Sequence, residues 1–310
     1  MPDRSSTSLG ARRILIRCAN SFLCRSFKAI CALQLGDRRA TISLLVLAHR
    51  FASLPAGGTA RKHWSPKVSV HALSNSLVIP YETMRRSVNV LIKEGLCERD
   101  GRDSIVLCAN QKSQTAVARL RETMTEQLLT MLRDLQAVGF DFQAAREAGR
   151  LPEATDSAEQ LPPRVDLADA SGVLFLRLLE VGGPLHRHDY LRTIVLAAIV
   201  SSNMAHAARD KAVMWQFGAI ADPPPDALRK AVSVRSISEM LGISVETTRR
   251  TVCQLIDDDE CIRVGGQGVM VPAEVLARKE MLQVATGVAL RVEQALADLA
   301  YRQFDFASLA

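Results

Sequence analysis

One predicted helix carries four polar residues at a spacing that places them on a single face. They are Glu82, Arg86, Asn89 and Lys93. At 100° per residue these positions share one side of a helix, and the apolar residues Met84, Val88, Leu91 and Ile92 share the other. An arginine can donate two hydrogen bonds to guanine O6 and N7, and a glutamate can accept one from cytosine N4. The polar face therefore has the chemistry that base contacts in the DNA major groove require.

Residues beside this face could contact the phosphate backbone. Arg85 lies on its flank, and Thr83 could donate to a phosphate near the helix start, where Tyr81 is the first residue. A different interpretation is that Glu82 and Arg86 form only a surface ion pair at i, i+4, worth a few tenths (~0.3) of a kcal/mol. The repetition of the pattern elsewhere in the chain favours the DNA interpretation.

The helix belongs to a segment that occurs twice in the chain. The first copy begins near Val68, and the second begins near Val232 at a constant offset. Val68-Ser-Val-His-Ala-Leu-Ser matches Val232-Ser-Val-Arg-Ser-Ile-Ser, Glu82-Thr-Met-Arg-Arg matches Glu246-Thr-Thr-Arg-Arg, and Phe140-Asp-Phe matches Phe304-Asp-Phe. One offset without a gap over residues 68–142 indicates an internal duplication. The second copy adds further candidate DNA contacts, which are Glu246, Thr247, Arg249 and Arg250.

Each copy predicts a helix, a turn, a second helix and two strands. The helices are expected at 70–77 and 81–94, then at 234–241 and 245–257. The strands are expected at 96–99 and 104–107, then at 261–264 and 269–271. The strand regions carry Arg99, Arg102 and Arg263, which would approach the DNA backbone. Longer helices are expected before each motif, at 39–51 and 190–204, and after it, at 114–138 and 274–303.

This order is typical of the winged helix-turn-helix, and the motifs at 82–86 and 246–250 resemble a known family. Their Glu-Thr-x-x-Arg pattern resembles the recognition helix of the cyclic-AMP receptor protein/Fnr family and, more loosely, of GntR-type repressors. That family's arginine before the glutamate is replaced by Tyr81 and Val245, and its nucleotide-binding β-roll has no counterpart. The whole arrangement resembles MarR-type regulators, which are usually homodimers held by terminal helices. The resemblance implies a mainly α fold with small β wings, as two tandem domains in a pseudo-two-fold duplication.

The two copies differ in charge. The second polar face contains Glu246, Arg250, Cys253 and Asp257, and it continues into the acidic run 257–260. Acidic residues beside a phosphate backbone repel it. We therefore expect the first copy to recognise DNA better than the second. The second copy would bind DNA weakly, or would serve dimerisation or a protein partner.

Length, composition and charge limit the possible domain organisation and partners. The chain has 310 residues, 39 Lys and Arg, 33 Asp and Glu, and a formal charge of +6. Residues 1–67 hold 12 of the basic residues and 2 of the acidic ones, which favours a polyanionic partner. Aromatic residues make up 5%, too few for a protein that stacks single-stranded bases. We expect a loose basic tail at 1–12, domains at 13–142 and 167–310, and a linker at 143–166.

Nothing in the sequence predicts a catalytic, metal or cofactor site. No Cys-x-x-Cys occurs, and Cys18, Cys24 and Cys31 are expected to pack in a core as reduced thiols. The segment 186–189, His-Arg-His-Asp, is interpreted as a hydrogen-bonded loop, and Trp64 and Trp215 as core residues. Charges interrupt every long apolar stretch, so we expect neither a membrane helix nor a signal peptide.

These observations predict a cytoplasmic bacterial transcription regulator that binds double-stranded DNA and is not an enzyme. The recognition helices would be 81–94 and 245–257, in a pseudo-dimeric monomer or a homodimer, with any small-molecule effector unknown. One alternative is a plasmid-type replication initiator, which also carries tandem winged helices. The other is a protein-binding scaffold, which the acidic run at 257–260 favours.

Overall fold

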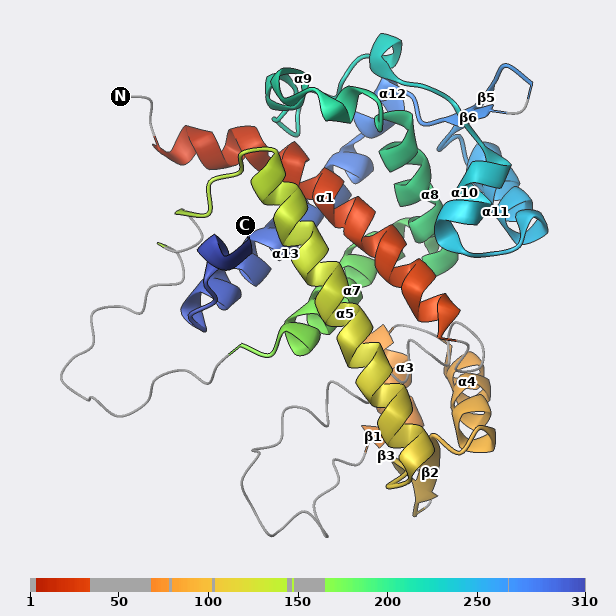
Figure 1. Ribbon diagram of the computed structural model, residues 1–310. Coiled ribbons are helices and arrows are strands. Elements are labelled where there is room, and N and C mark those ends of the chain that lie inside the picture. Colours follow the sequence, from red (N-terminus) through yellow and green to blue (C-terminus); the bar gives the residue numbers. More distant parts are fainter. Residues whose placement is uncertain are drawn as a thin grey trace, which may run out of the picture.

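The computed structural model describes residues 4–33, 68–77, 80–101, 104–143, 147, 165–266 and 268–309. These residues form a mainly helical molecule with two small antiparallel sheets of three strands each (Figure 1). The α-helices are α1 Arg4–Ala32, α3 Val70–Leu77, α4 Tyr81–Lys93, α5 Gln111–Ala137, α7 Leu167–Gly182, α8 Tyr190–Asn203, α9 Lys211–Gln216, α10 Val234–Leu241, α11 Val245–Asp257, α12 Ala273–Leu276 and α13 Lys279–Tyr301. The short 3-10 helices are η2 Gly183–His186, η3 Ala207–Arg209, η4 Asp226–Leu228 and η5 Phe306–Leu309. The strands are β1 Val68–Ser69, β2 Cys97–Asp100, β3 Ser104–Leu107, β4 Val232–Ser233, β5 Ile262–Val264 and β6 Gly268–Met270.

The sequence repeat is also a repeat of structure. We call residues 68–107 the first unit and residues 232–270 the second unit. Each has a two-residue strand, two helices and two further strands, in the sheet orders β1-β3-β2 and β4-β6-β5. The registers correspond as well: Arg99 pairs with Ile105 in the first sheet, and Arg263 pairs with Val269 in the second.

The helix α4 ends where its sequence dictates. Glu94 is the C-cap, and Gly95 follows with a φ of +71°, a left-handed conformation that glycine adopts without steric cost. The N–H of Gly95 donates to the carbonyl of Ile92, and the N–H of Leu96 donates to that of Leu91. These two bonds form a Schellman motif, which satisfies the last carbonyls and directs the chain into β2.

Four long helices connect the two units and share one hydrophobic core. In the centre of Figure 1, α1 packs against α5 and α13, while α7 packs against the same two helices. At one end of this layer Phe142 stacks on Phe306, with ring centroids 4.7 Å apart. These phenylalanines are equivalent in the repeat, so matching parts of the two copies meet face to face. The buried residues of both copies form a single continuous cluster.

Several elements differ from the sequence expectation. The expected loose tail at 1–12 is wrong for residues 4–12, because α1 begins at Arg4, and Arg12 pairs with Glu293 at 2.9 Å. The strands β1 and β4 were not expected, since two residues are too few to show alternation. The expected C-terminal helix at 274–303 is divided into α12 and α13. The expected helix at 39–51, Trp64, Arg102 and most of the linker 143–166 lie outside the described residues.

Candidate nucleic-acid interface

The helix α4 divides into a buried and an exposed face, as the spacing predicted. Met84, Val88 and Leu91 are buried, and each fully buried side chain of this size contributes about 1.5–3 kcal/mol. On the other face Glu82, Arg86 and Lys93 are exposed and Asn89 is half-buried. The side chain of Arg86 is 77% exposed, so its guanidinium is open to a ligand.

Two arginines hold Glu82 in place. Arg85 donates to both carboxylate oxygens, at 2.8 and 2.7 Å, and Arg86 Nε donates to Oε1 at 3.2 Å. Mainly the hydrogen bonds from Arg85, and then those from Arg86, lower the pKa of Glu82 to about 2. The carboxylate therefore stays charged at any physiological pH and fixes the direction of both guanidinium groups. The i, i+4 pair that the sequence suggested is present, within a group of three.

The sheet adds one more cation to this face. Arg99 on β2 donates through Nη2 to Asn89 Oδ1 at 3.1 Å, across the gap between strand and helix. Arg99 is exposed, so it extends the polar face of α4 onto the sheet. Thr83 is half-buried, and Tyr81 is exposed at the start of the helix, with its ring centroid 6.4 Å from that of His71.

The second unit repeats this arrangement on α11. Arg249 donates to both oxygens of Glu246, at 2.9 and 2.8 Å, and these bonds lower the pKa of the carboxyl. Arg263 on β5 donates to Cys253 Sγ at 3.4 Å, the same strand-to-helix contact as in the first unit. Arg250 is exposed and forms no ion pair within the described chain. Thr247 Oγ1 accepts from the hydroxyl of the N-cap residue Ser244 at 2.8 Å.

The acidic run 257–260 is less repulsive than the sequence suggested. Glu260 turns inward, is 7% exposed and shares a hydrogen bond with His186 Nε2 at 2.8 Å. Asp258 forms an ion pair with Arg192, whose hydrogen bond lowers the pKa of that carboxyl. Two of the four acids are thus engaged by other elements, and only Asp257 and Asp259 remain exposed without such partners in the described structure.

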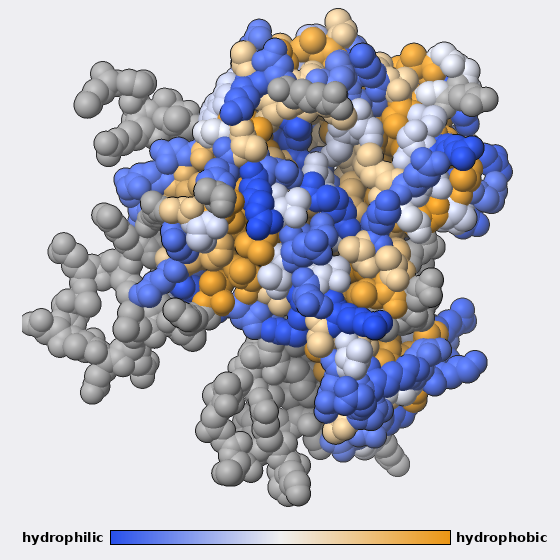
Figure 2. Space-filling view, in the orientation of Figure 1, coloured by the Kyte–Doolittle hydropathy of each residue, from blue (hydrophilic) through white to orange (hydrophobic). Residues whose placement is uncertain are grey.

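Both units lie along the same edge of the molecule. In Figure 1, α4 and α11 are on the right-hand side, below and above the end of α1. The surface over α4 and its sheet is mostly hydrophilic in Figure 2. The two polar helix faces therefore belong to separate lobes on one edge of the molecule.

The other sequence interpretations concern the cysteines of α1, the loop at 186–189 and Trp215. Cys18 and Cys24 are buried, which raises the pKa of each thiol to about 12 and keeps it protonated. In the loop at 186–189, His186 is bound by Thr193 and Glu260, and Asp189 caps α8. The expectation for Trp215 is wrong: it is 37% exposed, and its indole N–H donates to the carbonyl of Val138.

Two other features are missing from the residues that the structure describes. No group of three or more His, Cys, Asp or Glu residues there is placed to hold a metal ion. None of the helices there combines the length and apolar character needed to cross a membrane.

Sequence reasoning missed one polar cluster altogether. Arg13 and Arg17 of α1 and Arg229, which follows η4, line a cavity beside the middle of α1. A signal was present, because Arg13 and Arg17 interrupt an apolar stretch at i, i+4 and so share one helix face. Arg229 comes from a segment more than 200 residues away, and no local pattern links it to them.

Comparison with protein-family models, with curated proteins and with solved structures finds no match for this chain.

Proposed function

We propose that this protein is a sequence-specific double-stranded DNA-binding regulator of transcription, built from two tandem winged helix-turn-helix units. The helices α4 and α11 would enter the major groove, and the strands β2–β3 and β5–β6 would form the wings beside the backbone. A MarR-like pseudo-dimer within one chain accounts for the reciprocal packing of α1, α5, α7 and α13.

One observation carries the proposal: the same exposed cationic arrangement occurs in both units. In each, a glutamate fixes the arginine three residues on, and a strand arginine reaches the polar face of the helix. The two copies have diverged at many other positions, and both keep the ion pair and the strand arginine, which supports a shared role for these residues. In the first unit Arg86 donates only its Nε to Glu82, so its Nη groups stay available for two-bond contacts with guanine.

The experiment is selection of duplexes from sheared genomic DNA by the full chain, at several salt concentrations, followed by sequencing of the bound fragments. The proposal predicts a few enriched sites that persist near physiological salt. Sites at promoters support regulation, and directly repeated sites at an origin support the replication initiator instead. Binding without enrichment that disappears as salt rises contradicts sequence-specific recognition, because non-specific affinity is mostly electrostatic.

The structure also gives a reason to retain the scaffold alternative for the second unit. Ile262 and Val264 on the edge strand β5 are 44% and 38% exposed. Their equivalents in the first unit are Glu98 and Asp100. Exposed apolar residues on an edge strand suit contact with protein better than contact with phosphate. If the second unit binds protein, the variants Ile262→Glu and Val264→Asp leave DNA affinity unchanged and abolish co-purification of the partner.

A further inference from the structure

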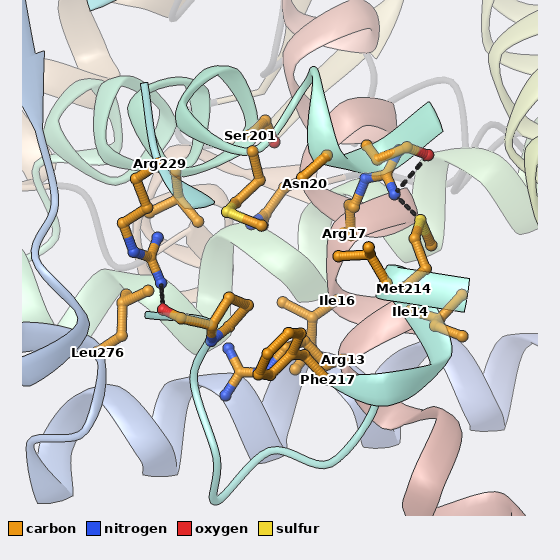
Figure 3. A pocket seen from close by; sticks show the side chains of 16 residues that line it. Arg13, Ile14, Ile16, Arg17, Asn20, Ser201, Met214, Phe217, Arg229 and Leu276 are labelled. Carbon is orange, nitrogen blue, oxygen red and sulfur yellow. Dashed lines mark hydrogen bonds between the residues drawn. The ribbon is translucent and has the colours of Figure 1, made fainter. Parts of the chain in front are cut away.

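Two cavities of the described structure lie next to each other along α1. The first, shown in Figure 3, lies between α1, α8, α9 and the segment around η4, and has a volume of about 630 Å³. The second lies between α1, α7, α8 and α13, and has a volume of about 830 Å³. Both cavities are lined by Arg13, Ile16, Asn20, Val200 and Leu276, so the two adjoin.

We call the first part the arginine chamber, because three guanidinium groups surround it. In Figure 3, Arg13 and Arg229 lie on one side and Arg17 lies on the other. None of the described residues that line either part is acidic. The carboxylates that act on these arginines are Asp226, 3.2 Å from Arg229 Nε, and, at longer range, Asp222 on Arg13 and Asp134 on Arg17.

The positive charges in this chamber are only partly compensated. Arg13 Nε donates to the carbonyl of Ala219 at 3.0 Å, and Arg17 Nη1 donates to that of Ala208 at 3.3 Å. Arg229 is fully buried; its Nη2 donates to the carbonyl of Pro224, and its Nη1 has no partner in the described structure. Burial, and then the nearby charge of Arg229, lower the pKa of Arg13 to about 10. Three neighbouring cations, of which Arg229 is fully buried and Arg13 and Arg17 are half-buried, favour the entry of an anion.

We call the second part the apolar chamber. Its walls are mainly aliphatic, with Leu23, Leu178, Leu196, Met281 and Val288 among them. No phenylalanine, tyrosine or tryptophan is among the described residues that line it, so it suits a flexible alkyl chain better than a ring that needs a stacking partner. Its far end is formed by His186 and Thr193, which hydrogen-bond each other at 2.9 Å.

We propose that the two adjoining cavities open into each other and together bind an aliphatic carboxylate of medium chain length. The carboxylate would lie among Arg13, Arg17 and Arg229, and the alkyl chain would extend between α1, α8 and α13 into the apolar chamber. Guanidinium groups recognise carboxylates by charge-assisted pairs of hydrogen bonds. Displacing water from aliphatic walls supplies the remaining affinity.

The position of the site suggests a regulatory consequence, which rests on the proposed DNA-binding function. His186 connects the apolar chamber to Glu260, and the Glu260 N–H donates to Leu255 of α11 at 2.8 Å. A ligand that displaces His186 would act directly on the end of α11. The binding proposal itself requires no DNA and is tested without it.

Isothermal titration calorimetry of the full chain with decanoate, below its micellar concentration, tests the binding proposal. We expect saturable binding at one site, no detectable binding of acetate, and affinity for 1-decanol that is weaker by about tenfold or more. If decanoate shows no saturable binding, the proposal is overturned. Equal affinity for decanol and decanoate overturns it too, because the arginines would then play no part. These comparisons use the unaltered chain and do not depend on a variant folding.

Variants then locate the site. Arg17→Gln is expected to weaken decanoate binding about tenfold, and Ala285→Leu, which fills the apolar chamber, is expected to weaken it as well. Arg25→Gln is the matched control, because Arg25 lies on the same helix but pairs with Asp134 outside the cavity. An equal loss in Arg25→Gln and Arg17→Gln contradicts the assignment. A separate measurement of DNA affinity with and without decanoate tests the coupling, and its failure leaves the binding result intact.

Discussion

The first and second units share one backbone design and differ in how each secures the end of its second helix. In the first unit Gly95 adopts the left-handed conformation and Leu96 is buried behind it. In the second unit Asp259 adopts that conformation with a φ of +56°, and the equivalent of Leu96 is the buried Glu260. The repeat thus keeps the hydrogen-bonded turn, while the apolar contact of Leu96 is exchanged for the polar, hydrogen-bonded contact of Glu260.

The presence of Glu260 at the position of Leu96 changes how the second helix of the unit is connected to the rest of the molecule. Leu96 only packs, whereas Glu260 joins α11 to His186 on η2 and, at 3.9 Å, to Arg192 on α8. A buried carboxylate must keep its partner, because an unpaired charge in the interior is strongly unfavourable. The second helix of the second unit is therefore tied to the helical layer by specific polar contacts.

The largest effect is expected from His186→Leu. This change leaves Glu260 buried without its main hydrogen bond, and we expect the free energy of unfolding to fall by about 3–5 kcal/mol. The double variant His186→Leu/Glu260→Leu recreates the apolar contact of the first unit and is expected to recover most of that loss. Urea denaturation followed by circular dichroism measures both. A double variant as unstable as the single one would show that the loss of the His186–Glu260 hydrogen bond is not the cause.

A smaller effect on stability is expected when the residues with positive φ, Gly95 and Asp259, are exchanged between the units. A Cβ atom placed on Gly95 would meet no other atom within 4 Å, so Gly95→Asp adds no clash and only the cost of positive φ. We expect it to lower the free energy of unfolding by about 1 kcal/mol, and Asp259→Gly to raise it by up to about 1 kcal/mol. Thermal unfolding of the two variants beside the unaltered chain checks this. Changes of the same sign would contradict the equivalence of the two turns.

The smallest effect is expected at the strand arginines. If Arg99 contacts a phosphate, Arg99→Ala reduces the slope of log affinity against log salt by about 1 on an enriched duplex. Arg263→Ala is expected to reduce it less, because Asp257 and Asp259 remain exposed beside α11. Fluorescence anisotropy over a salt series measures the slopes. An unchanged slope in Arg99→Ala would remove the wing of the first unit from the interface.

Local sequence signals predicted the repeated units well. The bounds of α3, β3, α10 and α11 agree with the expected ranges, since the apolar spacing, the N-cap Ser244 and the turn glycines are all local. The inward turn of Glu260 could not be predicted, because its partner His186 is 74 residues away. The arginine chamber was hidden for the same reason, as Arg229 meets α1 only through tertiary packing. The DNA-contacting roles of the site residues stay predictions.

The most direct test of the central claim is the affinity of Arg86→Ala for an enriched duplex. We expect a loss of about 1–3 kcal/mol with relaxed specificity at one base pair, and a smaller loss for Arg250→Ala. Arg177→Ala is the matched control, because Arg177 is exposed and pairs with Glu180 on α7, away from both units. Weaker binding by Arg86→Ala with normal binding by Arg177→Ala would support α4 as the recognition helix. Unchanged binding by Arg86→Ala would contradict it.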